Sequence, residues 1–440
     1  MINIFNVEEA KDGILRRETS LEPDVPPALQ ASLNRLFGEG ATPETAVTTI
    51  LRDVRQRRDE ALHYWTETLD GVQVTSLQVS MSAIKTAIGR IPADLREALE
   101  LAAGRIRDFH RRQPLPNWQT NEMGGIVGQR VTPIQRVGVY VPGGTAPLPS
   151  SLLMSVIPAQ VAGVPEIVVA TPPGRDDGRI PDVILATAAI CGIDTIYTLG
   201  GAQAVAALAF GTQSVPRVDK IVGPGNLFTT LAKRQVYGIV GIDGLYGPTE
   251  TVVVADDSAD PAWVAADMLA QAEHDVLATA ILFTPSRKLA EGVQREIARQ
   301  MEELSRSEVI AVSLANRGGI VLTADLDEAC RLASDFAAEH TCIATQNPSA
   351  YVDKIPNAGG LFIGERSFEV LGDYVAGPSH VMPTNGTARF ASPLNVFDFV
   401  KISSILQLDD ATSAQLSVAA ARSAQAEALD AHANAAQKRV

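Results

Sequence analysis

Cysteine is scarce in this chain of 440 residues, which contains only Cys191, Cys330 and Cys342. The three are odd in number, widely spaced and set in largely apolar stretches, so we expect reduced core residues of a cytoplasmic protein rather than disulfides. Cys342 follows His340 by two positions, which leaves a reactive thiol as an alternative. A nucleophilic thiol needs a polar, electropositive setting, and residues 341–344 instead have the pattern of a buried strand.

Long apolar runs and excess positive charge are also lacking. No stretch has the uninterrupted apolar length needed to cross a bilayer, and residues 1–6 lack the basic start and apolar run of a signal peptide. The chain has 37 Lys and Arg against 51 Asp and Glu, a net charge of −14. The basic run at 52–58 continues into acidic residues, which is typical of a solvated helix face. We therefore expect neither a membrane nor a nucleic-acid partner.

What remains is the composition of a globular protein, with 46% hydrophobic and 20% charged residues. This length predicts roughly two or three domains. Residues 1–115 are expected to form a helical N-terminal region, with helices at 42–64 and 82–112 and a proline-rich loop at 22–27. The proline-containing segment 114–118 is interpreted as a linker.

From residue 128 onward, short β-rich runs alternate with helical runs. In the first series we expect strands at 138–141, 166–170, 195–198 and 219–222, and helices at 150–161, 181–191 and 202–210. In the second we expect strands at 251–255, 279–283, 309–312 and 341–344, and helices at 261–274, 288–304 and 326–339. Such alternation is typical of parallel sheets that are covered on both faces.

The predicted fold class is therefore α/β, with two similar Rossmann-like, doubly wound parallel-sheet domains at residues 128–248 and 249–390. Beyond Asp398 the chain is expected to become helical again. Residues 391–440 would then form a helical C-terminal tail. Its alanine-rich run at 411–438 is too polar for a core helix and too apolar for free solution, so we expect it to pack on a partner subunit.

Three glycine-containing turns follow predicted strands of the first series, at 142–145, 200–201 and 223–225. Each has a polar or aromatic residue beside it, namely Tyr140, Gln203 and Asn226. Glycine lets the backbone approach a ligand, helix starts favour anions, and ligands bind at the carboxyl ends of strands in open α/β sheets. These turns predict a nucleotide crevice. Simple tight turns remain the alternative, because none has the spaced three-glycine dinucleotide fingerprint.

Histidine gathers late in the sequence, where four of the six lie beyond residue 270. Gln271 and His274 are three positions apart on a predicted helix, which places both side chains on one face within reach of one metal ion. Asp373 and His432 are candidates for the remaining ligands. A mixed oxygen and imidazole set suits Zn²⁺, with Mn²⁺ or Co²⁺ possible by geometry. Alternatively, Gln271 is an ordinary polar helix residue and His432 faces solvent.

Glu339 and His340 stand together where a predicted helix closes and the next strand begins. Adjacent general bases suit a two-stage oxidation, in which one accepts an alcohol proton and the other activates water. The alternative is a histidine that only satisfies carbonyl groups at a helix C-terminus.

Taken together, the motifs resemble those of histidinol dehydrogenases, from about residue 5 to the carboxyl terminus. The segments that carry the resemblance are residues 140–144, 200–204, 220–226, 247–250, 271–274, 338–340, 377–380 and 383–384. The resemblance implies NAD⁺-dependent oxidation of L-histidinol to L-histidine through an aldehyde, the last step of histidine biosynthesis. It also implies one Zn²⁺ per subunit and a homodimer whose C-terminal tail contributes to the neighbouring active site.

The resemblance also implies roles for individual residues. Glu339 and His340 match the paired catalytic bases, and the NAD⁺-contacting positions match Tyr140, Gln203 and Asn226. The zinc ligands match Gln271, His274, Asp373 and His432, of which His432 would come from the partner subunit. The substrate contacts comprise these four ligands and Thr249, His340, His380 and Glu427.

This chain departs from the family pattern in three places. Thr249 stands where serine is usual, Thr341 stands where leucine is common, and residues 391–395 lack the usual glycine. None removes a proposed ligand, but the departures leave room for a dehydrogenase of another alcohol, such as a sulfonated diol. A zinc hydrolase and a non-catalytic metal- or nucleotide-binding protein are further alternatives. The hydrolase would have no use for Gln203 and Asn226.

Overall fold

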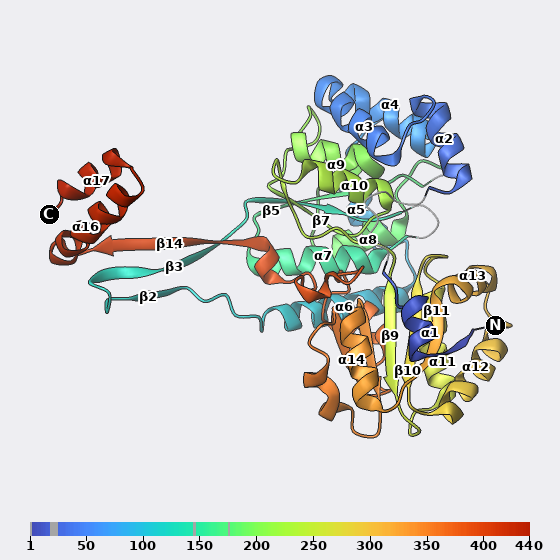
Figure 1. Cartoon of the computed structure of the whole chain (residues 1–440). Helices are drawn as coiled ribbons and strands as arrows, with labels where there is room; N and C mark the ends of the chain where they lie inside the picture. The colour runs from blue at the N-terminus through green and yellow to red at the C-terminus, as the bar shows by residue number, and fades with distance from the viewer. Residues whose placement is uncertain (1, 18–24, 144–146, 175–176) are drawn as a thin grey trace.

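Two parallel β-sheets organise the body of the molecule in the computed structural model, which describes residues 2–17, 25–143, 147–174 and 177–440 (Figure 1). The first sheet has five strands in the order β6-β5-β4-β7-β8. The second has six strands in the order β1-β11-β10-β9-β12-β13. With β1 set aside, both sheets follow one plan: the first strand of each is central, the next two lie on one side and the last two on the other. This shared order confirms the prediction of two similar doubly wound halves.

The first half alternates strands and helices along the chain. Its strands are β4 (Arg136–Tyr140), β5 (Glu166–Thr171), β6 (Ile196–Thr198), β7 (Lys220–Val222) and β8 (Gly241–Ile242), and its helices are α7 (Pro149–Ala162), α8 (Asp182–Ile190), α9 (Gly201–Phe210) and α10 (Leu227–Val236). Helices α7, α8 and α9 are apolar and buried over most of their length, because each packs against further helices and α7 and α9 also pack against strands of the sheet.

The second half repeats this alternation. Its strands are β9 (Glu250–Ala255), β10 (Thr279–Thr284), β11 (Gly318–Leu322), β12 (His340–Ala344) and β13 (Gly360–Ile363), and its helices are α11 (Pro261–Ala272), α12 (Arg287–Met301), α13 (Ser307–Arg317), α14 (Leu326–Phe336) and α15 (Glu369–Tyr374). Every residue of β9, β10 and β12 is buried, as expected for central strands of a sheet covered on both faces.

One predicted strand of the second half is wrong. Residues 309–312 lie inside helix α13, and the strand that follows is β11. The run of β-branched residues suggested a strand, but Ile310, Ser313 and Leu314 are buried at helical spacing while Val312 is 44% exposed. This one-sided burial is the pattern of an amphipathic helix.

The helical N-terminal region packs mostly on the first half. Its helices are α2 (Pro27–Phe37), α3 (Pro43–Arg57), α4 (Asp59–Asp70), α5 (Met81–Ala87) and α6 (Ala93–His110), and α3 contacts α9 while α5 contacts α8. The start of the chain differs. Strand β1 (Ile4–Asn6) pairs in parallel with β11, and helix α1 (Val7–Asp12) follows it. The first residues therefore belong to the second sheet.

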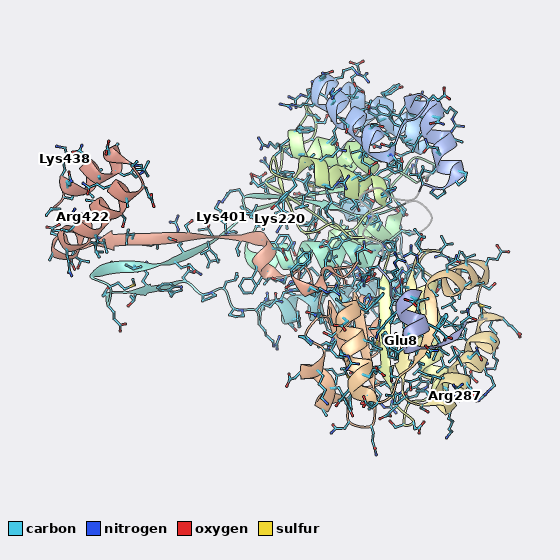
Figure 2. The ribbon with its side chains drawn as sticks, viewed as in Figure 1. Glu8, Lys220, Arg287, Lys401, Arg422 and Lys438 are labelled. Atoms are coloured by element: carbon cyan, nitrogen blue, oxygen red, sulfur yellow. The ribbon has the colours of Figure 1, made fainter. Side chains whose placement is uncertain are left out.

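A long antiparallel arm carries the end of the chain away from the body (Figure 1). Strand β14 (Val400–Leu408) pairs with β3 (Gly125–Pro133), which pairs with β2 (Trp118–Thr120). The expectation of helix directly beyond Asp398 is wrong over β14, and helices α16 (Asp410–Ala426) and α17 (Asp430–Gln437) follow it as expected. Figure 2 shows Lys401 at the base of the arm and Arg422 and Lys438 on the helices at its tip. In the described part of the chain, no helix has the length and apolarity to cross a membrane.

Candidate active site

The candidate bases lie at the amino end of strand β12 in the second sheet, beside the start of its neighbour β9. Glu339 directly precedes β12, and His340 is its first residue, in parallel register with Thr251 of β9. Thr249 and Glu250 stand at the start of β9. Gln271 is in the last turn of α11, the helix that brings the chain back to this edge. The alternating strands and helices thus gather side chains that are far apart in the sequence.

Glu339 is buried and hydrogen-bonded from two sides. The Thr249 hydroxyl donates to its Oε2 at 2.5 Å, and the Glu250 backbone N–H donates to the same oxygen at 3.2 Å. The Gln271 amide in turn donates to the Thr249 hydroxyl at 2.9 Å. Burial raises the pKa of Glu339 to about 7, although the positive charge of His340 and these hydrogen bonds oppose the rise. A carboxyl with this pKa can exchange protons near neutral pH.

His340 is enclosed by polar groups. Its Nδ1 lies 3.3 Å from the Glu250 carbonyl oxygen, and its Nε2 lies 3.4 Å from Asp373 Oδ1. Carboxylate oxygens of Glu339 and Glu369 are each 3.8 Å from Nδ1. Burial alone would lower the pKa of His340, but the surrounding carboxylates outweigh it and raise the pKa to about 10. The pocket therefore stabilises the protonated imidazole.

Glu369 also belongs to this cluster, although no motif in the sequence marked it as a site residue. Its side chain is buried and accepts a hydrogen bond from the Thr251 hydroxyl. The pKa of Glu369 is raised to about 8, first by burial, with His340 opposing the rise. The signal in the sequence was its spacing of four from Asp373, which places both carboxylates on one face of α15.

One group of side chains in this cluster could hold a metal ion. Ligand atoms of His340, Glu369 and Asp373 lie within 4.8 Å of one another. Only Asp373 belongs to the set Gln271, His274, Asp373 and His432 that the sequence analysis predicted. Among the described residues, Gln271 Oε1 is a buried oxygen without a hydrogen-bond partner. A buried oxygen of this kind gains most from an added cation or donor.

Two further predicted histidines lie around Asp373. His380 Nδ1 is 2.8 Å from the Asp373 carbonyl oxygen, and its Nε2 is 3.4 Å from the Ser151 hydroxyl. His274 follows α11 in a turn and is exposed as a residue, although its ring is partly enclosed. Desolvation lowers the pKa of His274, the Asp373 carboxylate opposes this effect, and the positive charge of His340 adds to it. Both imidazoles therefore belong to the charge cluster.

His432 and Glu427 are not brought to this cluster within the chain. His432 lies on α17 and Glu427 caps the end of α16, and both are exposed. These helices stand at the tip of the arm, away from the second sheet (Figure 1).

The three predicted nucleotide-contacting residues meet at the carboxyl ends of β4, β6 and β7. The Tyr140 hydroxyl accepts a hydrogen bond from the Gly201 N–H at 3.1 Å, and Asn226 Oδ1 accepts one from the Thr229 N–H at 3.1 Å. Gln203 Oε1 is buried and, in the described part of the chain, has no hydrogen-bond partner. Gly144 and Thr145 of the first glycine turn lie outside the described residues.

Gly223 shows why glycine is required where β7 ends beside its neighbour β4. It has a φ of +112°, and a Cβ at this position would lie 2.1 Å from the Tyr140 carbonyl oxygen. Strands β4 and β7 are the neighbours between which the strand order reverses. Ligands of doubly wound sheets bind at such a reversal.

The cysteines have the inert setting that the sequence predicted. Cys191, Cys330 and Cys342 are unpaired and buried. Burial raises the pKa of the Cys191 thiol to about 12 and that of Cys330 to about 11, and it raises the pKa of Cys342 well above the usual value. A thiol with a raised pKa carries little thiolate and is a poor nucleophile.

Comparison with known proteins identifies the family. Residues 38–440 match the family model described as histidinol dehydrogenase. The chain is 49% identical over 441 residues to the histidinol dehydrogenase of Deinococcus radiodurans, with all of both chains covered. It is 47% identical over 430 residues to that of Thermus thermophilus, with 98% of both chains covered.

A solved structure agrees with these relatives. The crystal structure of histidinol dehydrogenase from Elizabethkingia anophelis matches with a TM-score of 0.90 and 32% sequence identity, over 100% of this chain and 98% of that one. Family match, full-length relatives and fold therefore point the same way. The chain belongs to the histidinol dehydrogenase family.

Proposed function

We propose that this chain oxidises L-histidinol to L-histidine through L-histidinaldehyde, with two NAD⁺ consumed, in the last step of histidine biosynthesis. Family membership supports the reaction. The structural observation that carries it is the buried pair of Glu339 and His340 beside Asp373 and Gln271, a set of two bases next to metal-binding groups. A two-stage oxidation needs a base in each stage.

His340 and Glu339 would divide the proton transfers between them. In the first stage His340 accepts the hydroxyl proton as the carbinol carbon loses hydride, giving the aldehyde. His340 must be neutral for this step, and a cation held by Asp373 would offset the carboxylate charge that raises its pKa. In the second stage Glu339 takes a proton from the water that adds to the aldehyde, and the resulting anionic adduct loses a second hydride to give the acid. NAD⁺, when bound, is the hydride acceptor in both stages.

The residues present fit a metal ion. Gln271 Oε1 is buried and unpartnered among the described residues, and Asp373 and His274 supply a carboxylate and an imidazole to the same cluster. We propose one Zn²⁺ held by Gln271, His274, Asp373 and His432 of a second copy. Bound zinc would anchor histidinol, whose imidazole and amine are good ligands for a borderline metal. Thr249, His340, His380 and Glu427 would complete the substrate contacts.

The residues at the carboxyl edge of the first sheet fit a nucleotide in the same way. The buried acceptor Gln203 Oε1 lacks a partner within the described residues, and Tyr140 and Asn226 lie at neighbouring strand ends. Helices α9 and α10 begin at this edge, and helix starts favour phosphate groups. We propose that these three residues contact NAD⁺.

A homodimer would complete the site. Helices α16 and α17 lie at the end of the arm, and Ile402, Leu406, Leu416 and Val418 are each at least half exposed there. Apolar side chains gathered in this way are usual where another chain packs. We propose that the tail of one subunit brings His432 and Glu427 to the site of the other. A cytoplasmic location is also proposed, supported by three buried, unpaired cysteines.

The deciding experiment counts NADH formed per histidinol consumed. A ratio near two is expected for the four-electron reaction, whereas a hydrolase forms none. Oxidation of a sulfonated diol in preference to histidinol would redirect the proposal to another alcohol. Chelator treatment should abolish turnover, and Zn²⁺ or Mn²⁺ should restore it.

The shared site has a separate test. Inactive His432→Ala and His340→Asn subunits, mixed to form verified heterodimers, should regain part of the activity, because one composite site then has both histidines intact. Heterodimers without activity would contradict the contribution of the tail and leave the reaction itself untouched.

A further inference from the structure

Arg17 lies beside the candidate bases although it is far from them in the sequence. Strand β1 and helix α1 fix the start of the chain on the second sheet, where Glu8 of α1 is labelled in Figure 2. The backbone then turns, with the Leu15 and Arg16 N–H groups bonded to the carbonyls of Ala10 and Gly13. This placement delivers Arg17 to the amino ends of the strands.

The Arg17 guanidinium joins two segments of the second half. Its Nη1 and Nη2 donate to Oε1 and Oε2 of Glu250 at 2.5 and 2.9 Å, a two-pronged ion pair with a carboxylate that is 5% exposed. Nε and Nη2 also donate to the Phe336 carbonyl oxygen at 3.0 and 2.7 Å, and the guanidinium lies 4.0 Å from the centre of the Phe336 ring. Only arginine offers this planar set of donors.

Both segments that Arg17 joins lie next to the candidate bases. The Glu250 backbone N–H donates to Glu339, and the Glu250 carbonyl oxygen faces Nδ1 of His340. Phe336 ends α14, and a left-handed residue, Ala337 at φ +53°, turns the chain toward Glu339 two residues later. Movement of either segment would therefore displace a carboxylate or an imidazole from its reacting position.

We propose that Arg17 is a positioning residue that aligns Glu339 and His340 together through Glu250 and Phe336. The inference rests on the proposed function of the two bases. Arg17 precedes the residues 38–440 that match the family model, and it touches neither base directly. Its effect would be on the geometry of proton transfer, because displacement of a reacting group by about 1 Å can cost about 100-fold in rate.

The test compares Arg17→Met with Arg16→Met, an exposed arginine one position earlier. We expect Arg17→Met to lower kcat by about 10- to 100-fold with little change in KM for histidinol, and Arg16→Met to match the unaltered enzyme. Oxidation of histidinol and of added histidinaldehyde should slow together, because one residue supports both bases. An Arg17→Met, Glu250→Gln double variant should be hardly slower than the slower single variant, because the two residues act as one unit.

The outcomes separate this inference from the proposed function. An unaltered enzyme that forms no NADH from histidinol would refute the function itself. An active enzyme in which Arg17→Met equals Arg16→Met, or in which only KM changes, would refute the positioning role. If Arg17→Met does not fold, Arg17→Lys decides by the same criteria, since it keeps the charge and loses the two-pronged geometry. Circular dichroism and thermal unfolding establish which variants are folded.

Discussion

With β1 set aside, the two sheets share one strand order, and their candidate site residues lie at opposite ends of the strands. In the first sheet the glycine turns and the residues Tyr140, Gln203 and Asn226 lie at the carboxyl ends, where helices α9 and α10 begin. In the second sheet the titratable cluster lies at the amino ends, where α11 and α14 finish. Helix starts carry partial positive charge and favour phosphates, whereas helix ends favour cations. One architecture therefore offers one edge suited to anions and one suited to cations.

The largest effect is expected when the titratable cluster at the amino ends of the second sheet is disabled and the first sheet is left unchanged. We expect His340→Asn to lower kcat by about 100- to 10,000-fold, the usual contribution of a general base. Affinity for NAD⁺ should persist, because the first sheet is untouched. Steady-state kinetics with calorimetric titration of NAD⁺ checks both points. His63→Asn, an exposed histidine on α4, is the matched control, and equal turnover in the two variants would contradict the division of labour.

At the carboxyl ends of the first sheet, the backbone of Gly223 is held by a buried ion pair. Lys233 and Asp243 have side chains that are 2% and 1% exposed. Lys233 donates to the Gly223 carbonyl oxygen at 3.0 Å, and Asp243 accepts from the Gly223 N–H at 2.7 Å. Lys233→Met leaves the carboxylate buried without its partner, so we expect a loss of about 3–5 kcal/mol in the free energy of unfolding.

Urea denaturation measures that loss, with Arg234→Met, a partly exposed neighbour on α10, as the control. At temperatures where the Lys233→Met variant is folded, its affinity for NAD⁺ should fall more than its affinity for histidinol. A loss confined to histidinol would contradict the assignment of the two edges.

A smaller effect is expected from a substitution at Gly223, where β7 ends beside β4. Gly223 and Gly192 both have left-handed φ values, of +112° and +71°, but only at Gly223 would a Cβ meet backbone, whereas nothing lies within 4 Å of one at Gly192. Gly192→Ala measures backbone strain alone. Gly223→Ala should cost about 1–3 kcal/mol more in unfolding free energy, as forced overpacking does, and should weaken NAD⁺ binding. Equal losses of unfolding free energy in the two variants would show that the backbone around Gly223 and Tyr140 can shift to accept a Cβ.

Much of the fold could be predicted because buried strands appear in the sequence as short apolar runs. Strand β10 was placed within one residue, since a short apolar run between helical patterns has few other interpretations. Strand β14 was missed because most of its residues are exposed on the arm, so neither face produces a period-two burial pattern. The run at 309–312 misled because β-branched side chains also occur in helices when tertiary packing favours it.

The residues of the candidate site also include some that the sequence indicated and some that it did not. Motifs located Glu339, His340, Thr249 and Gln271 in advance, and the structure places these four side chains in one cluster. Glu369 and the Arg17–Glu250 pair escaped notice. The Arg17–Glu250 pair spans 233 positions in the sequence, and no local pattern encodes a contact of that range. Such partners emerge only when the topology of the sheet is known.

Strand β1 has a consequence for handling the protein. It covers the outer side of β11 through parallel pairs from Ile4 to Asn6, and Ile2 beside it is 1% exposed. Trimming these residues would uncover the unpaired amide and carbonyl groups of β11, a template on which other chains could add and aggregate. Variants shortened at this terminus would then lose yield through precipitation, even with every group of the reacting centre intact.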